Sequence, residues 1–158
     1  MAEKDSVIMY KRMCRALKES GFNHERDDAR LRINAKVNGD NPIKVMMQID
    51  DMRKLVSYYT HLDFEVAPDD RHIFAQGVCA LNLLLADGSF DFNPKTGKCL
   101  FRMTSAFRDS AISDEVFNYV LFVANKIVCD YKDVLQLLAS GKINLDNFLK
   151  LIKEGRDE

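Results

Sequence analysis

The chain of 158 residues is 47% hydrophobic and 30% charged, and its 23 basic and 24 acidic side chains leave a net charge of −1. This composition is typical of a globular domain, and it excludes an intrinsically disordered chain, a collagen-like repeat and a membrane protein. Proteins that bind nucleic acids usually carry an excess of Lys and Arg, which is absent here. We therefore expect one domain over residues 1–158, with no nucleic acid and no membrane among its partners.

The first half of the chain changes from helical to strand-like periodicity. Met9, Met13 and Leu17 recur at helical spacing, and Gly21 ends this segment. From residue 31 apolar and polar residues alternate, which is typical of half-buried strands. Short turns between three such runs predict an antiparallel meander. The expected elements are a helix over 6–20, with Lys11, Arg12, Arg15 and Lys18 on or beside its polar face, and strands over 31–37, 43–49 and 56–66.

The second half begins with a helix that Pro68 and two following acids introduce. A turn ending at Gly97 then joins two short strands, because glycine tolerates the positive φ that such a turn requires. Ser113 followed by two acids is typical of the start of a further, long helix. The expected elements are a helix over 68–86, strands over 90–92 and 99–103, a helix over 113–139 and a short helix over 144–153.

The strands occur in runs rather than alternating with helices, which predicts the α+β class. The order is α-β-β-β-α-β-β-α, followed by the appended C-terminal helix over 144–153. We expect an antiparallel sheet with the helices mainly on one face.

Four cysteines stand among apolar neighbours, at spacings that match no metal or redox motif. We expect buried free thiols at Cys14, Cys79, Cys99 and Cys129. The first residues lack the apolar core of a signal peptide, and no run approaches the roughly 20 apolar residues of a membrane span. These features favour a cytoplasmic protein.

The stretch from Ala80 to Gly97 resembles the YbjN family. Members of that family end the middle helix with an Asn, here Asn82, and continue with a Gly-x-Phe, an acidic residue and a turn glycine. The segments 62–68 and 113–115 also fit, so the resemblance covers residues 5–138 in element order. The helix over 144–153 and Asp87 depart from the family pattern.

The resemblance implies a bacterial protein with a fold similar to that of type III secretion chaperones, which share the same element order. Members of the family are labelled sensory transduction regulators, and no enzymatic activity is established for them. The resemblance therefore supplies no catalytic, cofactor-binding or metal-binding residues.

His61, Asp63 and His72 support an alternative function as a metal-dependent enzyme or binder. His61 and Asp63 share one face of a strand, His72 lies one turn into the next helix, and both residue types are common zinc ligands. Their spacing matches no metal motif, so solvated polar residues are the simpler interpretation. The acidic pairs at 27–28, 50–51 and 69–70 are interpreted as turn and helix caps.

The helix over 113–139 is apolar round most of its circumference, so it must be covered on more than one side. The second cover is either another subunit or client peptide, or the chain's own first or last helix. We predict a non-enzymatic, chaperone-like or regulatory protein-binding module without a cofactor, acting through apolar grooves or sheet edges as a homodimer. The expected dimer or partner surface is Val120, Ala124, Ile127 and Val128.

A weaker hypothesis is nucleic-acid binding through basic residues of the first predicted strand. Those residues are Arg30, Arg32 and Lys36.

Overall fold

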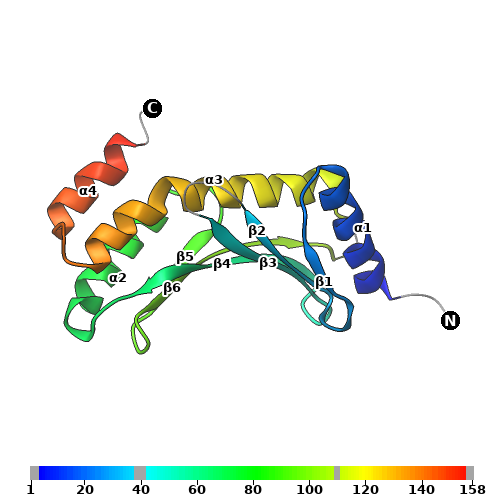
Figure 1. Ribbon diagram of the computed structural model, residues 1–158, viewed down its shortest axis with the longest axis horizontal. Coiled ribbons are helices and arrows are strands. Elements are labelled where there is room, and N and C mark those ends of the chain that lie inside the picture. Colours follow the sequence, from blue (N-terminus) through cyan, green and yellow to red (C-terminus); the bar gives the residue numbers. More distant parts are fainter. Residues whose placement is uncertain (1–3, 38–41, 109–110, 156–158) are drawn as a thin grey trace. The chain divides into compact units, whose positions relative to one another are not determined.

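The computed structural model describes residues 4–37, 42–108 and 111–155 (Figure 1). The described residues form four α-helices and a six-stranded antiparallel sheet in the order β1-β2-β3-β4-β6-β5. The helices are α1 (Asp5–Glu19), α2 (Arg71–Asn82), α3 (Asp114–Ala139) and α4 (Leu145–Glu154). The strands are β1 (Glu25–Asp27), β2 (Arg32–Val37), β3 (Ile43–Asp50), β4 (Leu55–Glu65), β5 (Ser89–Asn93) and β6 (Lys98–Ala106), and two 3-10 turns are η1 (Asp28–Arg30) and η2 (Pro68–Asp70).

The predicted α+β class and the order α-β-β-β-α-β-β-α are confirmed, and the terminal helix is present as α4. The structure adds the edge strand β1, which pairs with β2 through Glu25↔Asn34 to Asp27↔Arg32. Its three residues are all charged, so they show no apolar alternation that would indicate a strand. No helix among the described residues has the length and hydropathy of a membrane span.

Contacts group the chain into two compact units, and β4, β6 and α3 contribute residues to both. Unit 1 comprises Met1–Thr60 and Met103–Asn125, and unit 2 comprises His61–Arg102 and Lys126–Glu158. A single domain over residues 1–158 stays a prediction.

In unit 1, α1 packs its apolar face against β3. Met13 and Leu17 of α1 and Met47 of β3 are completely buried. The same unit also buries polar side chains that are hydrogen-bonded to each other. The Tyr58 hydroxyl donates to Asn125 Oδ1 at 2.5 Å and accepts from Thr60 Oγ1 at 2.8 Å. The amphipathic pattern of α1 therefore buries the face that the sequence predicts.

In unit 2, the core is rich in aromatic rings. The Phe74 ring centroid of α2 lies 4.8 Å from that of Phe92 and 5.8 Å from that of Phe64, both edge-to-face. Phe90 and Phe101 form a third such pair at 5.0 Å across β5 and β6. These geometries add to the burial energy of the rings.

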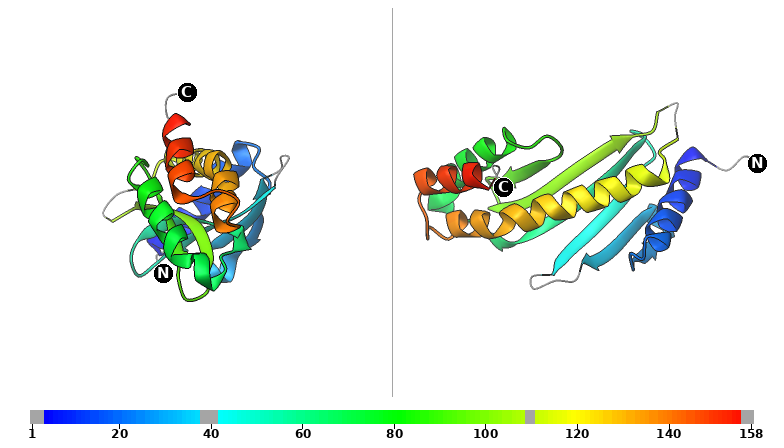
Figure 2. Two further views of the ribbon diagram at one scale, coloured as in Figure 1. Left: turned by 90° about the vertical axis from the view of Figure 1, so that its left-hand side faces the viewer. Right: turned by 90° about the horizontal axis from the view of Figure 1, so that it is seen from above.

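The helix α4 packs on α2, and the two lie side by side in Figures 1 and 2. Gly77 of α2 makes this approach close, because a Cβ there would collide with Leu138 and lie 3.3 Å from the Phe148 ring. Phe148 is completely buried and Ile152 nearly so. The last helix therefore packs on α2, whereas the sequence suggested it as one possible cover for the helix over 113–139.

The β5–β6 turn is fixed by Gly97 and Arg71. Gly97 has a φ of +74°, as the sequence predicts, and its carbonyl accepts from Val66 N–H at 2.9 Å. The Arg71 guanidinium donates to the carbonyls of Val66, Pro94 and Lys95 at 3.0, 3.1 and 2.8 Å. The start of α2 is thereby tied to the turn, and β5 is held beside the helix.

Candidate functional site

His61, Asp63 and His72 are all exposed side chains of unit 2. Within residues 4–37, 42–108 and 111–155, no group of three His, Cys, Asp or Glu side chains could hold a metal ion. The structure therefore does not assemble the metal site of the alternative hypothesis.

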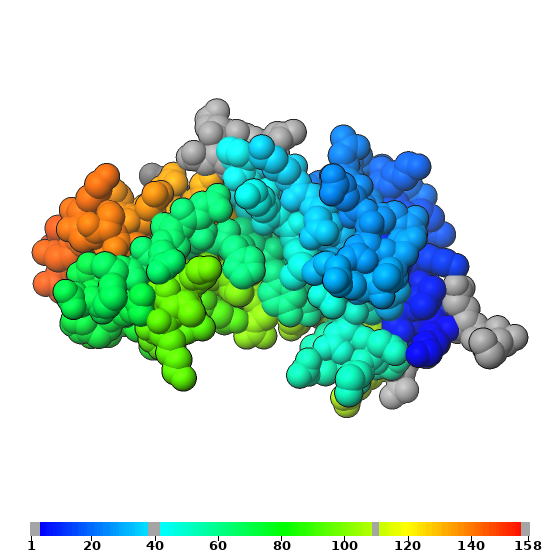
Figure 3. All heavy atoms as spheres, turned by 60° about the horizontal axis from the view of Figure 1, so that its bottom comes forward, coloured from blue at the N-terminus to red at the C-terminus, as the bar shows by residue number. Residues whose placement is uncertain are grey.

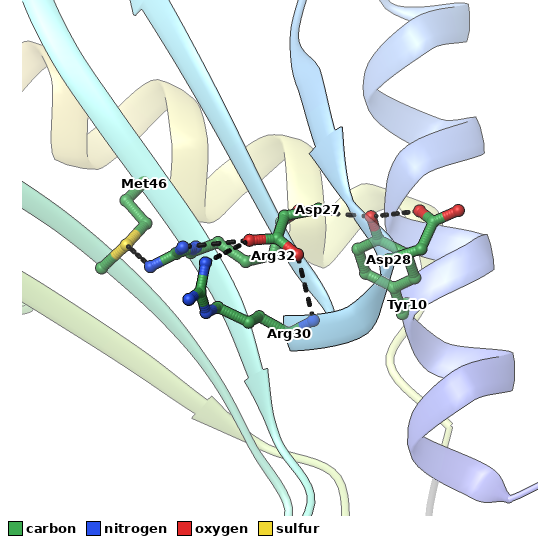
Figure 4. Close-up of polar contacts among 6 residues, drawn as sticks. All are labelled: Tyr10, Asp27, Asp28, Arg30, Arg32 and Met46. Carbon is green, nitrogen blue, oxygen red and sulfur yellow. Dashed lines mark hydrogen bonds and ion pairs between the residues drawn. The ribbon is translucent and has the colours of Figure 1, made fainter.

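The basic residues of the first predicted strand are largely engaged within the chain. The Asp27 carboxylate accepts from Arg30 Nη1 and from Arg32 Nη2, each at 3.1 Å, and Figure 4 shows both guanidinium groups converging on it. Arg30 lowers the pKa of Asp27 by hydrogen bonding, ahead of the weaker contribution of Arg32. Arg30 and Arg32 share the single carboxylate of Asp27, which offsets one of their two charges, and Lys36 is exposed. Nucleic-acid binding through these three residues stays a prediction.

Asp27 also caps η1, because its carboxylate accepts from the Arg30 backbone N–H at 3.2 Å. Its neighbour Asp28 accepts from the Tyr10 hydroxyl at 2.8 Å (Figure 4). Burial, together with this bond, raises the pKa of Tyr10. The acidic pair at 27–28 is therefore structural, in agreement with its interpretation as a cap.

Three of the four residues expected to form a dimer or partner surface on the long helix are buried within the chain. Val120, Ala124 and Val128 are 2%, 0% and 1% exposed, and Ile127 is half-buried. Residues four apart on a helix share a face, so the three buried residues form its inward stripe. The exposed large apolar side chains of α3 are instead Tyr119, Phe122 and Leu137.

Two of the four cysteines also differ from expectation. Cys14 and Cys99 are buried, and burial raises the pKa of the Cys99 thiol to about 12. Cys79 and Cys129 are exposed. Each follows a buried valine by one position, which turns its side chain about 100° round the helix from the core.

An apolar groove of about 460 Å³ lies in unit 2 between the end of α2 and β5. Leu83, one of its lining residues, exposes 82% of its surface. The surfaces of α2 and of the β5–β6 hairpin adjoin each other in Figure 3, in green and yellow-green. The groove is lined by Ala75, Val78, Cys79, Asn82, Leu83, Phe92 and Pro94.

β5 is an edge strand of the sheet, and Asn82 occupies part of its open side. The Asn82 amide donates to the Phe90 carbonyl and accepts from the Phe90 N–H, both at 2.9 Å. Alternation along an antiparallel strand points the N–H and C=O of Phe92 toward the same side. The edge therefore presents one pair of backbone groups beside the groove.

The Asn82 contact explains the Asn and Gly-x-Phe of the segment 80–97. Asn82 replaces a neighbouring strand at Phe90, and Gly88 has a φ of +71° with the Phe101 ring where a Cβ would stand. These residues of the segment 80–97 therefore fix the connection from α2 to β5. The groove was not predicted, because the expected helix ran to residue 86 and placed Leu83 inside the helix. In the structure α2 ends at Asn82 and Leu83 follows it.

Replacing Asn82 by Ala is expected to destabilise the fold by about 2 kcal/mol, because it leaves the half-buried polar groups of Phe90 without their side-chain partner. Urea unfolding would measure this loss, and amide hydrogen exchange at Phe90 should accelerate. The matched control is Asn147→Ala, whose side chain is exposed on α4 and should change stability by less than about 0.5 kcal/mol. Equal stabilities of the two variants would contradict the role of Asn82.

No protein-family model matches the sequence, and no curated protein matches it. Solved structures do match in fold. A chain of the ExsC–ExsE complex has a TM-score of 0.61 and 16% identity, covering 84% of this chain and 97% of that one. A chain of the HopA1–SchA chaperone–effector complex has a TM-score of 0.60 and 13% identity, covering 84% and 99%.

YbjN from E. coli, a proposed transcription regulator, has a TM-score of 0.55 and 10% identity, covering 84% of this chain and 90% of its own. The chain shares the fold of YbjN and of the matching chains in these two complexes. The predicted resemblance in fold is thereby confirmed.

Proposed function

We propose that the protein is a non-enzymatic, chaperone-like or regulatory module that binds a segment of another protein in the groove between α2 and β5. The observation that carries this proposal is the exposed Leu83 beside an apolar groove and an edge strand. An extended segment would place alternate apolar side chains against Leu83 and Phe92. Two structural neighbours, described as the ExsC–ExsE complex and a chaperone–effector complex, support a protein partner.

The Phe92 N–H and C=O would anchor the main chain of the bound segment. Asn82 occupies the edge at Phe90, and Pro94 has no N–H to donate. Backbone pairing is therefore short, and burial of apolar side chains would supply most of the affinity.

The test selects peptides from a displayed library of random extended sequences and compares binding to variants. Leu83→Asp should weaken the selected apolar peptides at least about tenfold, because it puts a charge at the groove. Met52→Asp is the matched control, since Met52 is 93% exposed in unit 1 and lies outside the groove. Bound peptide should also slow hydrogen exchange at the Phe92 amide. Peptides that bind both variants alike, without protecting Phe92, would refute the proposal.

We propose that the protein is a cytoplasmic homodimer and that exposed aromatic residues of α3 carry the contact. Tyr119 and Phe122 are 50% and 72% exposed and lie three residues apart on one helix face. Light scattering on the untagged protein should give twice 18.1 kDa, and Phe122→Asp should give a monomer. A wild-type monomer would exclude the dimer and leave a monomeric adaptor.

A further inference from the structure

A second groove, of about 470 Å³, lies in unit 1 between α1 and the segment 22–26. We name it the basic groove, since four of its described lining residues are cations and none is a carboxylate. It is lined by Lys11, Cys14, Arg15, Lys18, Phe22, Asn23, His24 and Arg26. It shares no residue with the apolar groove.

The cations of the basic groove remain open to solvent even where they have partners. Arg15 contacts Asp114 at 3.4 Å and Glu19 at 4.0 Å, yet its side chain is 58% exposed. Arg26 contacts Asp28 at 3.0 Å and is 49% exposed. Exposed ion pairs of this kind contribute little to stability, so an incoming carboxylate can compete for these cations.

The cations on α1 are spread along a line. At 1.5 Å per residue, Lys11, Arg15 and Lys18 stand about 6 and about 4.5 Å apart along the helix axis. Same-face side chains of an extended peptide repeat about every 6.8 Å, so their carboxylates can meet successive cations. A single phosphate would engage only part of this row.

The other wall suits a peptide with some apolar character. The Phe22 and His24 rings stack with centroids 6.4 Å apart at an interplanar angle of 23°. The buried Cys14 also lines the groove. Asp28 lies 3.0 Å from Arg26, so the groove offers a short row of cations on α1 rather than the long positive track that a nucleic-acid backbone needs.

We propose that the basic groove binds an acidic segment of a protein partner in an extended conformation. This site is distinct from the apolar groove and takes a ligand of opposite character. The carboxylates pair with the cations of α1 and with Arg26, while aliphatic parts of the segment pack on Phe22.

The probe is a rhodamine-labelled nine-residue peptide that alternates Glu with Ala, and its binding is followed by fluorescence anisotropy. Wild-type protein should bind it and should bind the Gln counterpart at least about tenfold more weakly. Raising the salt concentration from about 50 to about 300 mM should weaken binding of the Glu peptide, because salt screens exposed charges.

Lys18→Glu should reduce affinity for the Glu peptide at least about tenfold, whereas Lys153→Glu should change it less than about twofold. Lys153 is the matched control, since both lysines are exposed in the last turn of a helix. Circular dichroism checks that the variants are folded. Lys18→Gln should cause a smaller loss of affinity for the Glu peptide than Lys18→Glu, and it replaces Lys18→Glu in the test if that variant unfolds.

The proposal is overturned if the Glu peptide does not bind or if Lys18→Glu binds it as tightly as wild type does. It is equally overturned if Lys153→Glu loses as much affinity for the peptide as Lys18→Glu. It is also overturned if a single-stranded oligonucleotide of equal charge binds the groove more tightly than the peptide. Leu83→Asp should leave Glu-peptide binding unchanged, so failure of the apolar groove and failure of the basic groove are distinguished.

Discussion

Replacing Ala124 by Asp is expected to destabilise the fold by about 4 kcal/mol or more and to act on folding before it acts on any dimer. The Ala124 side chain is 0% exposed and belongs to the inward stripe of α3 with Val120 and Val128. A carboxylate there has no room and no partner, so it must protonate or admit water. Urea unfolding followed by circular dichroism would measure the loss.

Phe122→Asp is the matched control for this variant. Phe122 lies two residues from Ala124 on the same helix and is 72% exposed. Its replacement should change the free energy of unfolding of the monomer by less than about 1 kcal/mol. An Ala124→Asp protein with wild-type stability would show that this stripe of α3 faces solvent after all.

Replacing Phe148 by Ala is expected to cost about 3–5 kcal/mol, the usual range for removing a buried Phe side chain from a core. Phe148 is 0% exposed, and its ring lies against Gly77 of α2, where neither residue leaves space for water. The cavity would loosen α4 from α2, because Ile152 is the only other side chain of α4 classed as buried in the described residues. Urea unfolding and limited proteolysis near residue 145 would detect this loosening.

Leu151→Ala provides the control on the same helix, since Leu151 is 45% exposed and its loss should cost less than about 1 kcal/mol. If Phe148→Ala were no more destabilising than Leu151→Ala, the packing of α4 on α2 would be incidental to stability.

The strands and helices with clear periodicity were predictable, because alternation or a 3.6-residue repeat fixes their type. β1 was not, since its three charged residues become a strand only by pairing with β2. The inward stripe of α3 was misassigned, because an all-apolar circumference does not show which side approaches the sheet. The large Phe117 is buried with Val120 and Ala124, while Tyr119 and Phe122 stay exposed, so side-chain size does not reveal the inward face.

Neither groove was predictable from the sequence. The basic residues of α1 were visible as a polar face, but the opposing wall is the irregular segment leading into β1. The apolar groove depends on where α2 ends, and that boundary is set by Asn82 reaching β5 rather than by periodicity. Long-range contacts of this kind leave no local pattern.

The Asn82–Phe90 contact also bears on self-association of the sheet. An edge strand that is open along its length can template the addition of identical strands, the first step toward fibrils. Asn82 saturates the outer side of β5 at Phe90, and the proline after Asn93 cannot continue a ladder. At this edge only the backbone groups of Phe92 are open to another chain. One bound segment can pair there, but the pairing is too short to extend the sheet into a fibril.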